Sequence, residues 1–212
     1  MIYRRWEYIV ASDEVVTILP GGCRDIIWAA EGGLQTQIRL TQWDDQPRQK
    51  RLKAGTTLVG YRLCPGVVLD SAHWADATVD PGILGDMINS AADDYGMAEV
   101  IDALTQAQAT VAQVAKQGGV TVRTLQRRFR QLSLPNPEYW RLLGRARRAV
   151  QALPAGAPLA EIAHDSGYSD QAHMTRDFLR WFGQSPARLR RDHGLIAQVS
   201  QPGLGNWRPG TG

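Results

Sequence analysis

The sequence lacks the features that mark several large classes of protein. It has only two cysteines, Cys23 and Cys64, too few for a disulfide framework, and this scarcity favours a cytoplasmic protein. No apolar run approaches the roughly 18 residues of a membrane helix, and no charged and apolar leader ends in a small-residue cleavage site. We therefore expect neither membrane insertion nor secretion.

Motifs for common kinds of chemistry are also missing. The sequence contains no phosphate-binding loop, no dinucleotide fingerprint and no paired-cysteine zinc pattern. Asp70, Ser71 and His73 are residue types found in catalytic triads, but neighbouring positions on a strand point to opposite faces, so no triad follows from them. We expect a protein that is not an enzyme and that holds no cofactor and no metal.

What the sequence does have is an uneven distribution of charge. Residues 1–109 hold nine lysines and arginines against fifteen aspartates and glutamates, a net charge of −6, whereas residues 110–193 hold fourteen against six, a net charge of +8. An acidic half followed by a basic half indicates two domains, of which only one meets a polyanion. A solvated basic face would have the same composition, so charge alone does not establish DNA binding.

The first eighty or so residues read as short strands separated by turns. The segments rich in β-branched and aromatic residues are 6–10, 15–19, 25–28, 34–40 and 57–63. Proline, glycine and aspartate pairs separate them, at a spacing typical of a small all-β sandwich or barrel. Helical spacing of apolar residues replaces this pattern after Pro81-Gly82.

The basic half contains an internal repeat. Val114-Ala115, Gly119 and Thr121 recur 48 residues later as Ile162-Ala163, Gly167 and Ser169. Beyond the turn the offset is 49, which one extra residue in the second turn explains. The matching pairs are then Leu125 and Met174, Arg127 and Arg176, Phe129 and Phe178, Pro137 and Pro186, and Arg141 and Arg190.

Each copy makes local sense as a helix, a tight turn and a second helix. Thr110 and Gln113 have the spacing of a capping box, Gly118-Gly119 supplies the positive φ that ends a helix, and Thr121 suits the cap of the next one. The buried stripes that we expect on the second helices are Leu125, Phe129 and Leu132 in the first copy, and Met174, Phe178, Trp181 and Phe182 in the second.

The opposite face of each second helix carries side chains suited to reading DNA bases. Arg123, Gln126 and Arg127 share this face in the first copy. Arginine pairs with guanine and glutamine with adenine, each through two hydrogen bonds in the major groove. In the second copy Ala172, Thr175 and Arg176 face outward with His173 nearby. Because these polar side chains occupy the same helical face in both copies, the pattern favours base readout over an ordinary solvated surface.

One helix is predicted between the copies, over residues 139–153, bounded by Pro137 and Pro154 and carrying Arg141, Arg145, Arg147 and Arg148. A rod of this length, roughly 22 Å, suits two reading helices that enter successive major grooves about 34 Å apart. The predicted fold is therefore α+β with two domains: a barrel- or sandwich-like β-rich domain, then an all-α domain of seven helices in which a long helix joins two helix-turn-helix units.

Four segments follow from these patterns. We expect a β-rich domain over 1–83, a helical connector over 84–107 and a DNA-binding domain over 108–193. Residues 194–212 are rich in glycine and proline and are predicted to be a flexible tail.

Residues 108–193 resemble the DNA-binding domain of AraC/XylS-type regulators. The most specific match runs from Ile162-Ala163 through Gly167-Tyr168, Asp170-Gln171-Ala172-His173 and Arg176-Asp177-Phe178 to Gly183-Gln184-Ser185-Pro186. The resemblance implies base readout by Arg123, Gln126 and Arg127 in the first unit, and by Gln171, Ala172, His173 and Arg176 in the second. Met174 departs from the family pattern, which has leucine or phenylalanine there.

Phosphate contacts are expected from basic and hydroxyl side chains beside these helices. Arginine forks grip phosphate oxygens, and hydroxyl groups donate single hydrogen bonds to them. The candidates are Thr121, Arg128, Arg145, Arg148, Ser169 and Arg180.

The amino-terminal half resembles the small β-rich sensor domain of one AraC-like subgroup, through residues 18–28 and 59–66. The resemblance implies a module that binds an effector or dimerises, with Trp28, Cys23 and Trp74 as candidates for an effector pocket. The function expected is a sequence-specific regulator of transcription, activator or repressor, controlled by an unidentified effector. Its expected partners are double-stranded DNA, RNA polymerase and a second copy of the chain.

Two other functions remain open. Cys23, alone or with Cys64 and His73, could serve a thiol-reactive, metal-reactive or alkyl-accepting sensor, although free cysteines are commonly plain buried hydrophobes. The basic half could also bind DNA without sequence preference, in which case affinity would follow salt alone.

Overall fold

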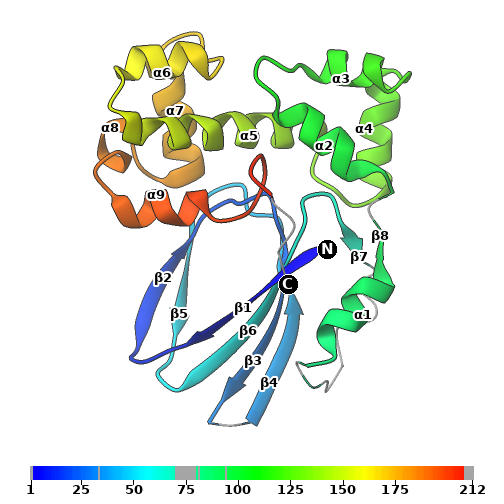
Figure 1. The fold of residues 1–212 in the computed structure, drawn as a ribbon, viewed down its shortest axis with the longest axis vertical. Helices are drawn as coiled ribbons and strands as arrows, with labels where there is room; N and C mark the ends of the chain where they lie inside the picture. The colour runs from blue at the N-terminus through cyan, green and yellow to red at the C-terminus, as the bar shows by residue number, and fades with distance from the viewer. Residues whose placement is uncertain (1, 33, 70–79, 81, 94, 208–212) are drawn as a thin grey trace.

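The chain folds into a strand-rich amino-terminal half and a helical carboxyl-terminal half, as the sequence predicts (Figure 1). The computed structural model describes residues 2–32, 34–69, 80, 82–93 and 95–207. No helix within these ranges is long and apolar enough to cross a bilayer.

The strands form one four-stranded antiparallel sheet and two small ribbons. The sheet has the order β1 (Tyr3–Ile9), β6 (Thr56–Leu63), β3 (Asp25–Glu31) and β4 (Leu34–Leu40). One ribbon pairs β2 (Glu14–Ile18) with β5 (Arg48–Leu52), and the other pairs β7 (Val68–Leu69) with β8 (Ala92–Asp93). The sequence did not predict β5, because its residues Arg-Gln-Lys-Arg-Leu have almost no apolar alternation.

One face of the four-stranded sheet packs against helix α1 (Leu84–Ala91). Strand residues at every second position, Ile26, Tyr61 and Leu63 among them, are buried with Leu84 and Ile88 of α1. Across the sheet Trp6 pairs with Gly60, where a Cβ atom would lie 1.9 Å from the indole. Only glycine therefore fits at position 60.

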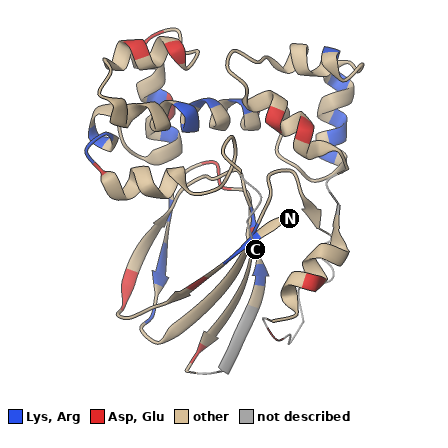
Figure 2. Cartoon of the chain, viewed as in Figure 1, with Lys and Arg blue, Asp and Glu red and all other residues tan. Residues whose placement is uncertain are grey.

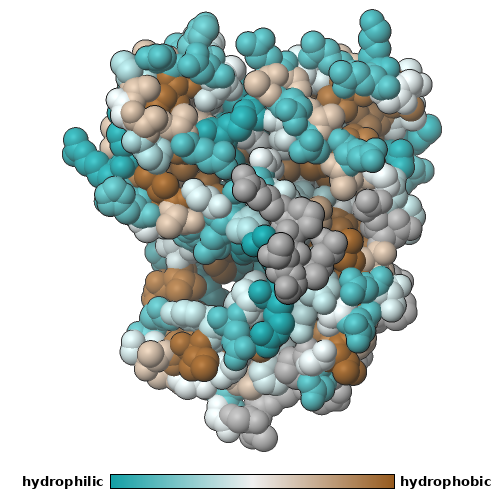
Figure 3. Space-filling model, viewed as in Figure 1, coloured by the Kyte–Doolittle hydropathy of each residue, from teal (hydrophilic) through white to brown (hydrophobic). Residues whose placement is uncertain are grey.

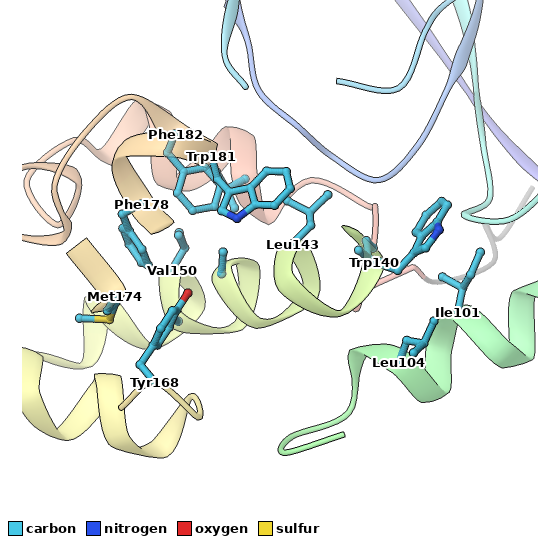
Figure 4. Close-up of a cluster of buried hydrophobic side chains, with 14 of the residues drawn as sticks. Ile101, Leu104, Trp140, Leu143, Val150, Tyr168, Met174, Phe178, Trp181 and Phe182 are labelled. Carbon is cyan, nitrogen blue, oxygen red and sulfur yellow. The ribbon is translucent and has the colours of Figure 1, made fainter. Parts of the chain in front are cut away.

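The helical half is built around α5 (Pro137–Ala152), the predicted linker helix. Trp140 and Leu143 of α5 are fully buried, and Ile101, Phe178 and Trp181 from the flanking helices complete this core (Figure 4). The flanking helices are α2 (Met97–Thr105), α3 (Val111–Gln117), α4 (Val122–Gln131), the short 3-10 helix η2 (Leu153–Ala155), α6 (Leu159–Asp165), α7 (Gln171–Phe182), α8 (Pro186–Leu189) and α9 (His193–Ser200).

The stretch predicted as a separate connector, 84–107, is divided between the two cores. Leu84 and Ile88 belong to the core of the sheet, whereas Met97, Ile101 and Leu104 of α2 belong to the helical core. Both helices are amphipathic, and their spacing could not show which neighbour covers each apolar face.

The prediction of a flexible tail from residue 194 is wrong for residues 194–207. Helix α9 continues to Ser200, and Val199 and Leu204 are each 1% exposed in the helical core. Composition misled the prediction here, because Gly203 and Gly205 serve turns of a packed segment. Residues 208–212 lie outside the described residues.

The guanidinium of Arg147 holds this carboxyl-terminal segment in place. Arg147 is 3% exposed and donates to the carbonyl oxygens of Leu204 and Gln201, at 2.8 and 3.0 Å, and to Asn206 Oδ1 at 3.0 Å. Burial lowers the pKa of Arg147 to about 10. Desolvating a cation costs several kcal/mol, which three charged hydrogen bonds of about 1.5–3 kcal/mol each offset.

The same segment joins the two halves of the chain. Leu204 N–H donates to Gly21 O at 3.0 Å, and Gln198 Nε2 donates to Thr17 O at 2.7 Å. Gly22 has φ +66°, and a Cβ atom there would lie 2.6 Å from Leu204 Cβ. Gly22 is thus required by the packing between the halves, whereas a Cβ atom at Gly21 would meet nothing within 4 Å.

We expect Arg147→Met to lower the free energy of unfolding by about 3 kcal/mol or more, because three acceptors around a buried guanidinium lose their charged donor. Urea denaturation measures the change. Arg188→Met is the matched control, since Arg188 is exposed on α8. Equal, small effects of the two substitutions would show that Arg147 does not anchor the segment.

Candidate nucleic-acid interface

The first helix-turn-helix unit consists of α3 and α4. Thr110 and Gln113 form the predicted capping box, with Thr110 N–H donating to Gln113 Oε1 at 2.9 Å and Gln113 N–H donating to Thr110 Oγ1 at 3.2 Å. Gly119 has φ +66° in the turn. Thr121 then caps α4 by accepting from Thr124 N–H at 3.1 Å. Local sequence therefore fixes the start of both helices.

The second unit, α6 and α7, repeats this geometry. Gly167 has φ +81°, and Tyr168 N–H donates to Ala163 O as Val120 N–H donates to Ala115 O in the first unit. The cap of α7 is Asp170, which accepts from His173 N–H at 2.6 Å. Asp170 rather than Ser169 thus matches Thr121, so the extra residue lies within the turn.

The outer faces of α4 and α7 are presented to solvent. Arg123, Gln126 and Arg127 of α4 are exposed, and the described residues offer none of them a hydrogen bond or an ion pair. Gln171, Ala172 and Arg176 are exposed on α7. Leu125 and Phe129, or Met174 and Phe178, hold the opposite face of each helix in the core, as predicted.

His173 lies differently from the other predicted base-reading residues. Its ring stands edge-on to Tyr168 at 5.2 Å, and its Nδ1 lies 3.1 Å from Ser169 Oγ. Its Nε2 lies 3.3 Å from Arg145 Nη2. The side chain is therefore half-buried and packed against its own domain, which places Gln171, Ala172 and Arg176 further outward.

Four of the predicted phosphate contacts lie on the surface. Thr121 and Ser169 are exposed in the two turns, and Arg180 is exposed on α7 with its guanidinium 4.6 Å from the centre of the Trp181 ring. Arg128 is exposed on α4 and donates to the carbonyl oxygen of Tyr95. Figure 2 marks lysine and arginine positions in blue along α4 and α5, and Figure 3 shows hydrophilic residues projecting from the helical half.

The remaining two, Arg145 and Arg148, lie on α5 and are less accessible. Arg145 is 6% exposed, pairs with Asp177 Oδ2 at 2.6 Å and lies 4.1 Å over the Tyr168 ring. The structure thus gives Arg145 partners within its own domain, and its contact with a DNA phosphate stays a prediction. Arg148 is half-buried and has no ion pair with a described residue.

The predicted effector-pocket residues are not brought together by the described part of the chain. Trp28 lies in β3 and packs against the core of the sheet, whereas Cys23 precedes β3 beside the junction with the helical half. Trp74, His73 and the sequence from Asp70 to His73 lie outside the described residues. Within the described ranges no three histidine, cysteine or acidic side chains cluster as metal ligands.

The environment of Cys23 does not favour a reactive thiol. Burial raises its pKa from 9.0 to about 12, and the nearby charge of Arg62 opposes this rise only in part. The thiolate is the nucleophile in alkylation and metal binding, so a raised pKa suppresses both.

Sequence reasoning did not assign the roles of Arg147 and Arg141. Arg147 anchors the carboxyl-terminal segment, and Arg141 pairs with Glu138 at 2.5 and 2.9 Å beside Arg145. A signal for Arg141 exists, because residues 141, 145 and 148 fall on one helical face. No local pattern marks Arg147, whose partners lie more than fifty residues away.

We expect Cys23 in a Cys64→Ser variant to react with iodoacetamide at pH 8 about a thousandfold more slowly in the folded than in the urea-unfolded chain, because each pKa unit changes the thiolate fraction about tenfold. Mass spectrometry of the peptide containing Cys23 follows the reaction. Comparable rates in both states would restore the reactive-thiol hypothesis.

Comparison with known proteins adds independent information. Residues 114–192 match the model of a family described as a helix-turn-helix domain. No curated protein sequence matches the chain significantly.

Several solved structures are similar in part. The carboxyl-terminal domain of AraT, a response regulator from Geobacillus stearothermophilus, is 25% identical, with a TM-score of 0.40 over 45% of this chain and 79% of that one. An AraC-type regulator from Chromobacterium violaceum is 25% identical, with a TM-score of 0.39 over 50% and 90% of the two chains. ToxT from Vibrio cholerae is 9% identical, with a TM-score of 0.47 over 94% and 100%.

At these TM-scores the assignment rests on the family model and on the two helix-turn-helix units. Residues 114–192 form an AraC-type helix-turn-helix domain, which supports a role in DNA binding and the regulation of transcription.

Proposed function

We propose that the chain binds a two-part site in double-stranded DNA, with α4 reading one half and α7 the other. The observation that carries this proposal is the equivalence of the two helices. Each starts at a capping side chain, Thr121 or Asp170, and each exposes an arginine six residues later, Arg127 or Arg176. Arginine forks pair with guanine in the major groove.

The length and packing of the linker helix support the proposal that a single chain reads both halves of the DNA site. Helix α5 has 16 residues, about 24 Å at 1.5 Å per residue, and its buried face packs against helices of both units. Reading helices held by such a rod suit successive major grooves about 34 Å apart. The base-reading residues in this proposal are Arg123, Gln126, Arg127, Gln171, Ala172 and Arg176, with His173 supporting α7 from behind.

Control by the amino-terminal half is the second part of the proposal. Residues 198–204 contact Thr17, Gly21 and Gly22 of the strand-rich half, and Arg147 binds this same segment to α5. A conformational change in the strand-rich half would therefore act on α5 through Arg147. An effector, RNA polymerase and a second copy of the chain stay predictions as partners. The family consists of regulators, which are generally not enzymes.

Selection of preferred sites from random duplexes tests this function. We expect a two-part motif with centres about one DNA turn apart. Arg127→Ala should relax specificity in one half and Arg176→Ala in the other, at a cost of about 1–3 kcal/mol each, because each removes one bidentate base contact. Arg51→Ala in β5, exposed in the other half of the chain, is the matched control and should change neither.

Enrichment of no motif, with affinity that follows only the salt concentration, would replace the regulator by a DNA-binding protein without sequence preference.

A further inference from the structure

A small cleft lies between the two helix-turn-helix units. Its floor is the face of α5 that carries Arg141, Arg145 and Arg148, one helical turn apart. One wall is the loop at residues 106–109 that leads into α3, and the other is the turn at residues 166–167 that leads toward α7. The cleft therefore touches both units at the elements that position their reading helices.

The arginines of the cleft are only partly neutralised. Arg141 pairs with Glu138, and Arg145 pairs with Asp177, whereas Arg148 has no carboxylate partner among the described residues. Arg145 Nε and Arg148 Nη1 are both buried, and the described part of the chain offers neither an acceptor. Arg145 as a whole is 94% buried, from an exposed fraction of 6%. A buried donor without an acceptor costs about 1–3 kcal/mol, which an anionic oxygen in the cleft would remove.

The chemistry of the cleft suits a phosphate group. Guanidinium groups offer several N–H donors in a fixed plane and bind phosphate oxygens strongly. The pairing of Arg145 with Asp177 fixes its position, so Arg148 supplies the uncompensated positive charge. The shared ligand chemistry is a phosphate monoester or diester.

The position of the cleft indicates where this phosphate comes from. Helices α3 and α6 lie on the side of α5 that faces away from the strands, and the loop before α3 borders the same side (Figure 1). In helix-turn-helix proteins the first helix meets the DNA backbone while the second enters the major groove. Two units in one chain therefore place the cleft opposite the stretch of backbone between the two major grooves.

We propose that this cleft binds one backbone phosphate of the DNA between the two half-sites. Arg148 is the principal ligand of the phosphate. Arg145, at the floor of the cleft, is a positioning residue that adds positive charge. The inference rests on the proposed two-part site. It adds a contact that depends on the spacing between the two half-sites, because a phosphate reaches the cleft only when both reading helices are bound in their major grooves.

The test uses the full chain and a duplex that carries the selected motif, measured by fluorescence anisotropy. A neutral methylphosphonate replaces each central linkage in turn. For the unsubstituted protein we expect one central position at which the neutral linkage weakens binding about tenfold, as loss of a charged hydrogen bond should. Arg148→Gln should bind the native duplex about tenfold more weakly, and the neutral linkage should not weaken its binding further. The dependence of its affinity on salt concentration should have a slope lower by about one.

Two further variants control this result. Arg148→Lys keeps the charge and should retain the salt slope while losing part of the affinity, because lysine lacks the planar fork. Arg51→Gln, which changes an exposed arginine of β5, should behave as the unsubstituted protein at every linkage.

The outcomes separate this inference from the proposed function. Tolerance of every central methylphosphonate, or full affinity of Arg148→Gln, would overturn the phosphate site while motif selection still stands. Competition by inorganic phosphate at matched ionic strength that Arg148→Gln abolishes, without any effect of the methylphosphonates, would place a free phosphorylated ligand in the cleft and overturn its assignment to DNA. Failure of the unsubstituted protein to enrich a motif would instead remove the proposed function.

Discussion

The buried guanidinium of Arg147 is the contact on which the joining of the two halves depends. It extends from the central helix α5 and holds the backbone of residues 201–206, and that segment in turn contacts Gly21 and packs Leu204 onto Gly22. A cation is suited to this position because several carbonyl oxygens converge on one point, where an apolar side chain would remove the charged donor that they share.

The side chains on the different faces of helix α5 have different roles. Trp140, Leu143 and Ala146 form the core of the helical half, Arg147 reaches the junction with the strands, and Arg145 and Arg148 line the cleft between the units. Because a rigid helix fixes all these faces relative to one another, a change at the junction can alter the setting of both reading helices. This geometry is the physical basis of the control that we propose.

The junction also changes the interpretation of the amino-terminal motif. Leu19 is buried in the helical core, Gly22 has the positive φ and the bare Cα that contact with Leu204 requires, and Cys23 beside them is a half-buried thiol with a raised pKa. This stretch, residues 19–23, is explained by packing between the halves. Two tryptophans of the strand-rich half likewise have structural partners: Trp6 lies over Gly60 and Trp43 stands edge-on to Trp140 at 5.0 Å.

The sequence by itself determined the elements whose causes are local. The capping box at Thr110, the cap at Thr121, the glycines at 119 and 167 and the buried stripes of α4 and α7 all follow from interactions within a few residues. Only the tertiary structure decided the partners of α1 and α2, the polar strand β5, the packing of residues 194–207 and the burial of Arg145 and Arg147. Each of these depends on residues far apart in the chain, and neither composition nor periodicity records which distant surface or acceptor an apolar face or a charge will meet.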